Sequence, residues 1–324
     1  MAWRLKLVPD NTQIDFFRLQ AITFGVSTLL AVASVVCLFV MGLNFGIDFR
    51  GGTTIRTEAT QPVDVGAYRQ AIAPLNLGDV AISQVFDPTF GADQHVAQIR
   101  IQAQEGAEAV SPETIAQVES ALQEVDPSIS FPSVESVGPK VSGELIQTAV
   151  MAVLASLAAI SLYIWFRFEW QFAAGAFVSL IHDVLITLGI FSLFQIKFDL
   201  TTIAALLTIL GYSINDTVVV FDRLRENLMK FKTTPLRDLM NLSVNETLSR
   251  TVMTSGTTLV ALIALLALGG DVIRGFVFAI TFGIVIGTYS SIYVAKNIVL
   301  WLGVKRDWSK PDPEALPDQF RDAP

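Results

Sequence analysis

The chain has 324 residues, of which 52% are hydrophobic and only 16% are charged. A soluble domain of average composition is about 25% charged, so this composition argues against a soluble protein. The net charge of −8 argues against a nucleic-acid partner, because surfaces that bind nucleic acids are basic.

Six apolar runs are long enough to cross a bilayer, which needs about 20 residues of helix. They cover residues 19–41, 145–166, 172–194, 199–221, 251–269 and 275–302. The sequence therefore predicts a polytopic α-helical membrane protein with six transmembrane helices. The short segments 1–18 and 303–324 flank it.

Charge asymmetry predicts the orientation. Positive charge gathers at the two termini and in the connections after the second and fourth spans: Arg4, Lys6, Arg18, Arg167, Arg223, Arg225, Lys230, Lys232, Arg237, Arg250, Lys305, Arg306 and Lys310. Residues 44–144 instead hold 5 basic and 14 acidic side chains. Cytoplasmic loops are enriched in Lys and Arg, so both termini and the basic segment at about 222–250 are expected in the cytoplasm. Residues 44–144 are expected on the outside. The apolar side chains of the basic segment, such as Leu224, Leu239 and Met240, suggest that it lies along the membrane surface.

The external segment alternates strand-like and helix-like patterns. Strand patterns occupy 53–59, 80–86, 95–103 and 129–137, and helical spacing occupies 63–75 and 112–125. Ser111 before Pro112 is typical of a helix N-cap. The order βαββαβ predicts an α+β domain of the ferredoxin-like type, with one sheet face left free for a partner.

Asp216 is the first of three ionisable positions inside the spans. It lies six residues before Asp222, where the fourth span meets the cytoplasmic charges, so Asp216 is expected about 9 Å deeper in the membrane than Asp222. Thr208, Tyr212 and Asn215 share its helical face. A carboxylate at such depth is costly and is usually kept for a function, although a structural hydrogen bond between helices remains the alternative.

Arg250 begins the fifth span, and a row of hydroxyl residues that includes Thr254 continues its face into the membrane. The alternative is an interfacial anchor whose charge reaches the surface. Asp216 and Arg250 lie at comparable depth on neighbouring spans. An ion pair between them that protonation of Asp216 releases would be a bistable element that a proton gradient can bias.

His182 and Asp183 occupy the middle of the third span. A histidine beside a carboxylate suits proton relay and equally suits a static hydrogen bond between helices. Of the two, Asp183 is the stronger functional candidate. Gly283 and Gly287 form a GxxxG pattern in the sixth span, which allows close helix contact.

No nucleotide-binding loop, zinc motif or nucleophile elbow occurs in the sequence, so we expect no enzyme activity, no metal and no cofactor.

Five motifs in order carry a family resemblance. They are Asn44–Gly52 (NFGIDFRGG), Val137–Leu145 (VGPKVSGEL), His182-Asp183, Gly211–Asn227 (from GYSINDT to DRLREN) and Thr247–Ser255 (TLSRT, then TS), followed by Gly269-Gly270. With this spacing, from about residue 40 to 300, the chain closely resembles the SecF branch of the SecD/SecF family, in the resistance-nodulation-division (RND) superfamily.

The resemblance implies a subunit of the bacterial protein translocase in the inner membrane. Such a chain supplies half of a twelve-helix unit, and a SecD-like six-helix subunit supplies the other half. The pair is expected to use the proton-motive force in late steps of Sec-dependent export, after the SecA ATPase and the SecYEG channel have acted on an unfolded polypeptide, with YajC as a further expected partner. Asp216 and Arg250 match the proton-transport positions of the family.

Two other functions stay open on the sequence. One is half of an RND-type exporter of small molecules, although a single small external domain argues against it. The other is a scaffold that stabilises the channel complex and transports nothing. The transported ion is expected to be H⁺, with Na⁺ as the alternative.

Overall fold

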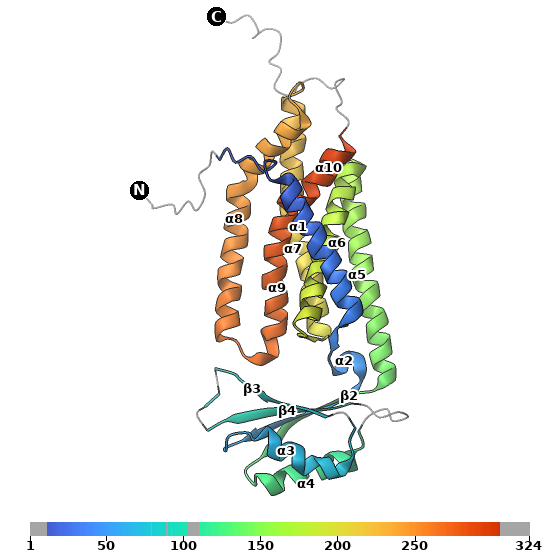
Figure 1. Ribbon diagram of the computed structural model, residues 1–324, viewed down its shortest axis with the longest axis vertical. Coiled ribbons are helices and arrows are strands. Elements are labelled where there is room, and N and C mark those ends of the chain that lie inside the picture. Colours follow the sequence, from blue (N-terminus) through green and yellow to red (C-terminus); the bar gives the residue numbers. More distant parts are fainter. Residues whose placement is uncertain (1–11, 79, 89, 92, 103–109, 305–324) are drawn as a thin grey trace, which may run out of the picture.

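The computed structural model describes residues 12–304, apart from residues 79, 89, 92 and 103–109. The predicted tail positions Arg4, Lys6, Lys305, Arg306 and Lys310 lie outside the described residues. The molecule is elongated, with a helical bundle at one end and a small α+β domain at the other (Figure 1). We call the two ends of the bundle the domain end and the far end.

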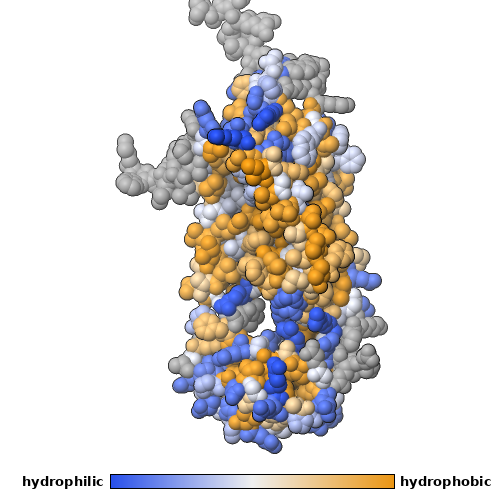
Figure 2. All heavy atoms as spheres, viewed as in Figure 1, coloured by the Kyte–Doolittle hydropathy of each residue, from blue (hydrophilic) through white to orange (hydrophobic). Residues whose placement is uncertain are grey.

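The six predicted spans are confirmed within the described residues. They are α1 (Gln20–Val40), α5 (Pro139–Arg167), α6 (Trp170–Leu193), α7 (Leu200–Lys230), α8 (Leu236–Leu268) and a last span made of α9 (Asp271–Ser290), a π-helical turn (Ser291–Ala295) and α10 (Lys296–Leu302). Apolar side chains cover the middle of the molecule as a broad belt, and polar side chains gather above and below it (Figure 2). This is the surface that a bilayer-spanning protein requires.

The helices α7 and α8 extend well beyond the predicted fourth and fifth spans. They form a helical hairpin at the far end (Figure 1), with only residues 231–235 between them. Leu224, Leu239 and Met240 are buried there in one cluster with Phe17 and Phe172. The expectation that this segment lies along the membrane surface is therefore wrong, because its apolar side chains pack against the bundle instead.

Small residues bring α9 close to α7, as the GxxxG pattern predicts. A Cβ atom at Gly283 would overlap the side chain of Ile209, and one at Gly287 would lie 2.9 Å from the Cβ of Ser213. The backbones of the two helices can approach this closely only because neither glycine has a side chain. The contact sets the position of Ser213, which belongs to the polar network described below.

The N-terminal segment is tied to the far end of the bundle. The amide of Asn245 on α8 accepts from the backbone N–H of Ile14 and donates to its carbonyl, both at 2.9 Å. The ammonium group of Lys296 on α10 donates to the carbonyl of Phe16 at 3.2 Å and lies 4.0 Å from the ring centre of Phe17. The π-helical turn directly precedes Lys296, which is buried although it lies within a span.

The α+β domain has the predicted βαββαβ order. Its elements are β2 (Gly52–Ala59), α3 (Val65–Ile72) with a 3₁₀ turn (Ala73–Leu75), β3 (Val80–Val85), β4 (His95–Gln102), α4 (Pro112–Val125) and β5 (Ser130–Val137). The strands pair antiparallel in the order β3-β4-β2-β5, which is the ferredoxin-like arrangement. Ser111 caps α4 as predicted, by accepting from the backbone N–H of Thr114 at 3.2 Å.

One face of the sheet is buried under α3 and α4, and the other faces the bundle (Figure 1). Ile55, Ile99 and Leu122 belong to the buried core. Because side chains alternate along a strand, the neighbouring positions Thr54 and Arg100, which pair across β2 and β4, point to the opposite face. The free face is thus polar and lies towards the membrane end of the helices.

A second, two-stranded sheet joins the domain to the bundle. The strand β1 (Asn44–Phe45), which follows α1, pairs in parallel with β6 (Lys197–Phe198), which precedes α7. The short helix α2 (Ile47–Arg50) then leads through Gly51 and Gly52 into β2. Both glycines have positive φ angles, 72° and 131°, which explains why this turn needs them.

Candidate proton-coupling site

Asp216 lies on α7 where α7, α8 and α9 meet. Its side chain is only 3% exposed. The hydroxyl of Ser255 on α8 donates to Oδ2 of Asp216 at 3.4 Å, and the same hydroxyl lies 2.8 Å from that of Thr288 on α9. The predicted carboxylate is therefore buried between helices and has a single weak hydrogen-bond partner in the described part of the chain.

Arg250 lies on α8, the helix that also carries Ser255. Ser255 follows Arg250 by five positions, which correspond to about 7.5 Å along the helix axis. Arg250 is exposed and forms no ion pair with Asp216 or with any other described carboxylate. The predicted ion pair is therefore not formed in this structure, in which the serine occupies the place beside Asp216.

Asp183 on α6 is the centre of a separate, fully buried network. Its Oδ2 atom accepts from the hydroxyls of Ser213 on α7 at 2.6 Å and Ser290 on α9 at 2.8 Å. Its Oδ1 atom lies 3.0 Å from Nδ1 of His182. The side chain of Asp183 is 0% exposed, so two hydroxyl donors and the imidazole of His182 compensate for the loss of water. This geometry favours the static hydrogen-bonding role over the relay.

The two networks meet on α7, where Ser213 and Asp216 are one turn apart. They are also close along α9, where Thr288 and Ser290 are two residues apart. The Nε2 atom of His182 is buried and has no hydrogen-bond partner in the described residues. A change in the packing of α7 against α8 and α9 would therefore act on both carboxylates.

Some of the supporting residues on the predicted polar faces form hydrogen bonds, and others are exposed. Tyr212 is half-buried, and its hydroxyl lies 3.3 Å from that of Thr258 on α8. Thr254 donates to the backbone of its own helix. Asn215 and Thr208 are exposed on the surface of α7, so this part of the face does not meet another described helix.

Sequence reasoning missed the roles of Ser213, Ser255, Thr288 and Ser290. A serine in a transmembrane helix commonly bonds to its own backbone, so its presence alone predicts no partner. Their spacing from Asp216 and Arg250 was the available signal, since Ser213 and Ser255 lie within a turn or two of these residues.

Ion pairs hold the far ends of α7 and α8 together. The guanidinium of Arg223 on α7 binds Glu246 on α8 at 2.7 Å and Glu226 at 2.6 Å. The amide of Asn227 donates to Glu246 at 2.8 Å and to Ser243 at 2.9 Å. These contacts join α7 to α8 two to three turns beyond Asp216. They therefore hold the two helices together on the far-end side of the site.

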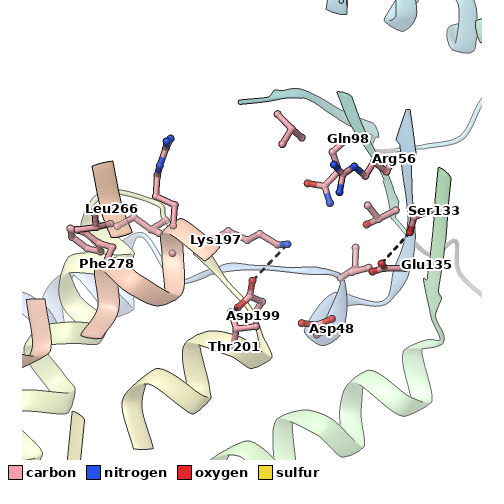
Figure 3. Close-up of a pocket in the computed structure, with 16 residues that line it drawn as sticks. Asp48, Arg56, Gln98, Ser133, Glu135, Lys197, Asp199, Thr201, Leu266 and Phe278 are labelled. Atoms are coloured by element: carbon pink, nitrogen blue, oxygen red, sulfur yellow. Dashed lines mark hydrogen bonds and ion pairs between the residues drawn. The ribbon is translucent and has the colours of Figure 1, made fainter. Parts of the chain in front are cut away.

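A cavity of about 720 Å³ separates the free sheet face from the domain end of the bundle. Arg56, Gln98 and Glu135 point into it from the sheet, and Lys197 points into it from the bundle (Figure 3). Lys197 pairs with Asp199 at 3.7 Å. An opening between the two parts is also visible in Figure 2. The domain therefore contacts the bundle at limited points, with a space between them that both charged and apolar side chains line.

Family comparisons match most of this chain. The C-terminal family of SecD/SecF protein export membrane proteins matches residues 117–305, and the SecD/SecF GG motif matches residues 38–63. The protein translocase subunit SecF of Cereibacter sphaeroides is 69% identical over 97% of both chains, and that of Rhodobacter capsulatus is 65% identical over 97% of this chain and 96% of the relative. The protein translocase subunit SecDF of Brucella abortus is 42% identical over 93% of this chain and 39% of its own length.

Solved structures show the same fold. The crystal structure of SecDF from Thermus thermophilus, described as a translocon-associated membrane protein, superposes with a TM-score of 0.79 at 38% identity. SecDF in a super-membrane-facing form superposes with a TM-score of 0.67 at 39% identity. The superpositions cover 91% and 90% of this chain, which spans about two fifths of the solved chains, 39% in each case.

Proposed function

Because the chain belongs to the SecD/SecF family of protein-export membrane proteins, we propose that it couples the proton-motive force to late steps of Sec-dependent protein export. The observation that carries this proposal is the buried carboxylate of Asp216, which lies between α7 and α8 within the part of the chain that the family matches. A protein that only anchored a complex would gain nothing from a buried acid at this depth.

The site offers Asp216 two alternative partners on α8. When the carboxyl group carries a proton it is neutral, and the hydroxyl of Ser255 suffices as a partner. When the proton leaves, the negative charge attracts the guanidinium of Arg250, which has no described ion pair. The two states differ in how α7 packs against α8, so proton passage would alternate between two arrangements. One charge that crosses 100 mV supplies about 2.3 kcal/mol, which is enough to bias such a change.

A second membrane subunit belongs to the proposal. SecDF relatives carry this region together with additional chain, so we propose a SecD-like six-helix partner. Exposed polar residues on the α7–α8 surface support this, because the hydrocarbon core would not solvate them. They are Thr208, Asn215, Arg250 and Thr257. We further propose contact with SecYEG and YajC, inner-membrane location with cytoplasmic termini, and an α+β domain on the periplasmic side that moves as it handles the exported chain.

The test is export into inverted membrane vesicles that contain the complete complex with Asp216→Asn. The matched control is Asp222→Asn, because Asp222 lies on the same helix but is 46% exposed and pairs with Arg167 at the surface. We expect both variants to assemble, and only Asp216→Asn to lose the stimulation of export by an ion gradient. Proton and sodium gradients are imposed separately, which identifies the ion.

Normal gradient-stimulated export by Asp216→Asn would refute the coupling role. If Asp216, Arg250 and Asp183 could all be replaced by neutral residues without effect, the scaffold function would be supported instead. Altered resistance to small toxic compounds, with protein export unaffected, would favour the small-molecule exporter.

A further inference from the structure

The Arg50-Gly51-Gly52 turn has no part in the proposed proton path, yet it creates a distinct cavity. Arg50 ends α2, and the two glycines turn the chain into β2 at the edge of the membrane. This brings Arg50 to a cavity of about 180 Å³ that Arg100 of β4 lines from the free sheet face. Phe45, Gly46 and Gly51 are among the other residues that line it, together with the polar side chains of Asn44 and Gln102.

The two guanidinium groups at this cavity have no acceptor in the described part of the chain. Neither takes part in a described hydrogen bond or ion pair, and Nε of Arg100 is buried without a partner. Burial lowers the pKa of Arg100, and the positive charge of Arg50 lowers it further. Two like charges therefore face one small space, an arrangement that costs free energy until an anion enters.

The carboxylates nearest to this pair are engaged elsewhere. Oδ2 of Asp48 accepts from the backbone N–H of Leu200 at 3.1 Å, at the start of α7. Asp199 caps the same helix through the N–H of Thr202 at 3.0 Å and also pairs with Lys197. The charges of both acids raise the pKa of Arg100, but neither acid forms an ion pair with it, so no described carboxylate pairs with either arginine of the cavity.

The position of the cavity indicates which anion fits. The side chains of Phe39 and Val40, at the end of α1, are 87% and 77% exposed and mark the hydrocarbon edge of the bilayer. Asn44 and Phe45, which line the cavity, follow only a few residues later. Phosphates of the lipid headgroups lie at this level, and the planar fork of a guanidinium matches two phosphate oxygens.

We propose that Arg50 and Arg100 bind the phosphate of an anionic phospholipid headgroup, which ties the α+β domain to the membrane surface. The Gly51-Gly52 turn then contributes to lipid binding, because it places Arg50 beside Arg100 at the depth of the headgroups. The site is separate from Asp216 and does not depend on proton coupling.

The test measures binding of dioctanoyl phosphatidylglycerol to the purified full chain in detergent by native mass spectrometry. The variants are Arg50→Gln, Arg100→Gln and both together. The matched control is Arg69→Gln, which removes the same charge from α3 on the far side of the sheet. We expect about tenfold weaker binding for each single variant and about a hundredfold for the pair, because each loses a charge-assisted hydrogen bond. Arg69→Gln should bind as wild type does.

Two further arms identify the source of the phosphate and protect against misfolding. Inorganic phosphate should bind much more weakly than the lipid, because it lacks acyl chains. If the double glutamine variant lowers the unfolding temperature of the domain, the double variant Arg50→Lys with Arg100→Lys is used instead. The lysine variant keeps both charges but loses the planar guanidinium fork, so it should still bind the lipid more weakly than wild type.

Three results would overturn the proposal. The first is equal lipid binding by wild type and the paired variant, and the second is equal affinity for inorganic phosphate and lipid. The third is unchanged lipid binding with loss of a copurifying membrane subunit, which would assign the arginines to a carboxylate on a protein partner.

Discussion

At the scale of single residues, the two buried aspartates have different surroundings and should respond differently to neutralisation. Asp183 accepts from Ser213 and Ser290 on two other helices, whereas Asp216 has one longer hydrogen bond to Ser255. A carboxylate that is held by several donors in place is suited to joining helices. One that is weakly held can exchange a proton and change partners.

We expect Asp183→Leu to lower the free energy of unfolding by about 1 kcal/mol, because two interhelical hydrogen bonds of about 0.6 kcal/mol each are lost. Asp183→Asn keeps an oxygen acceptor, so its loss should be smaller and gradient-stimulated export should persist. Unfolding in detergent and export in vesicles are measured on the same preparations. A stable Asp183→Asn protein without export would show that Asp183 relays protons after all.

The sequence predicts the carboxylates better than their partners. Asp216 is conspicuous because a charged group is rare within an apolar run, and its depth follows from helix geometry alone. Whether Arg250 or Ser255 stands beside it depends on the rotation of α8 against α7. That rotation is set by side-chain packing between the two helices, which the spacing along one helix does not contain.

At the scale of elements, the glycines of α9 determine how close it lies to α7. Gly287→Ala places a methyl group against Ser213, and such overpacking costs about 1–3 kcal/mol. The control is Gly211→Ala on α7, where a Cβ atom would meet nothing within 4 Å. We expect Gly287→Ala to lower the thermal unfolding temperature and Gly211→Ala to leave it unchanged. An equal effect of the two substitutions would contradict the close packing of α7 and α9.

Helix lengths show a further limit of sequence interpretation. An apolar run marks only the part of a helix that the bilayer covers, so the predicted fourth span ends near residue 221. The helix continues to Lys230 because its apolar side chains pack against α8 and the N-terminal segment outside that layer. The βαββαβ order was predictable, in contrast, because strand and helix periods alternate locally along the chain.

At the scale of the whole molecule, the α+β domain contacts the bundle closely enough for a disulfide to join them. A Cβ atom at Gly270, between α8 and α9, would lie 3.3 Å from the Cβ of Asp87, which follows β3. Cβ atoms in disulfides are about 3.5–4.5 Å apart, so a shift of a few tenths of an ångström at this contact should let Asp87→Cys and Gly270→Cys form one. The natural cysteine, Cys37, is replaced by serine to leave a single pair.

If the domain moves during export, oxidation of this double variant should reduce gradient-stimulated export to the level of Asp216→Asn. A reductant should restore export, and each single-cysteine variant should be insensitive to oxidation. Full export by the cross-linked protein would show that the domain works without separating from the bundle at this contact.

The position of the domain against the bundle could not be predicted from the sequence. It depends on pairing between β1 and β6, two-residue strands that lie about 150 positions apart and carry no detectable pattern of their own. The cavity between sheet and bundle and the arginine pair at the GG turn follow from that pairing. Both were therefore visible only in three dimensions.

Ion current through the complete complex in a planar bilayer tests the central claim most directly, with wild type, Asp216→Asn and Asp222→Asn compared under a proton gradient. The account predicts a proton current for wild type and Asp222→Asn, and none for Asp216→Asn. A proton current of wild-type size through Asp216→Asn would contradict it.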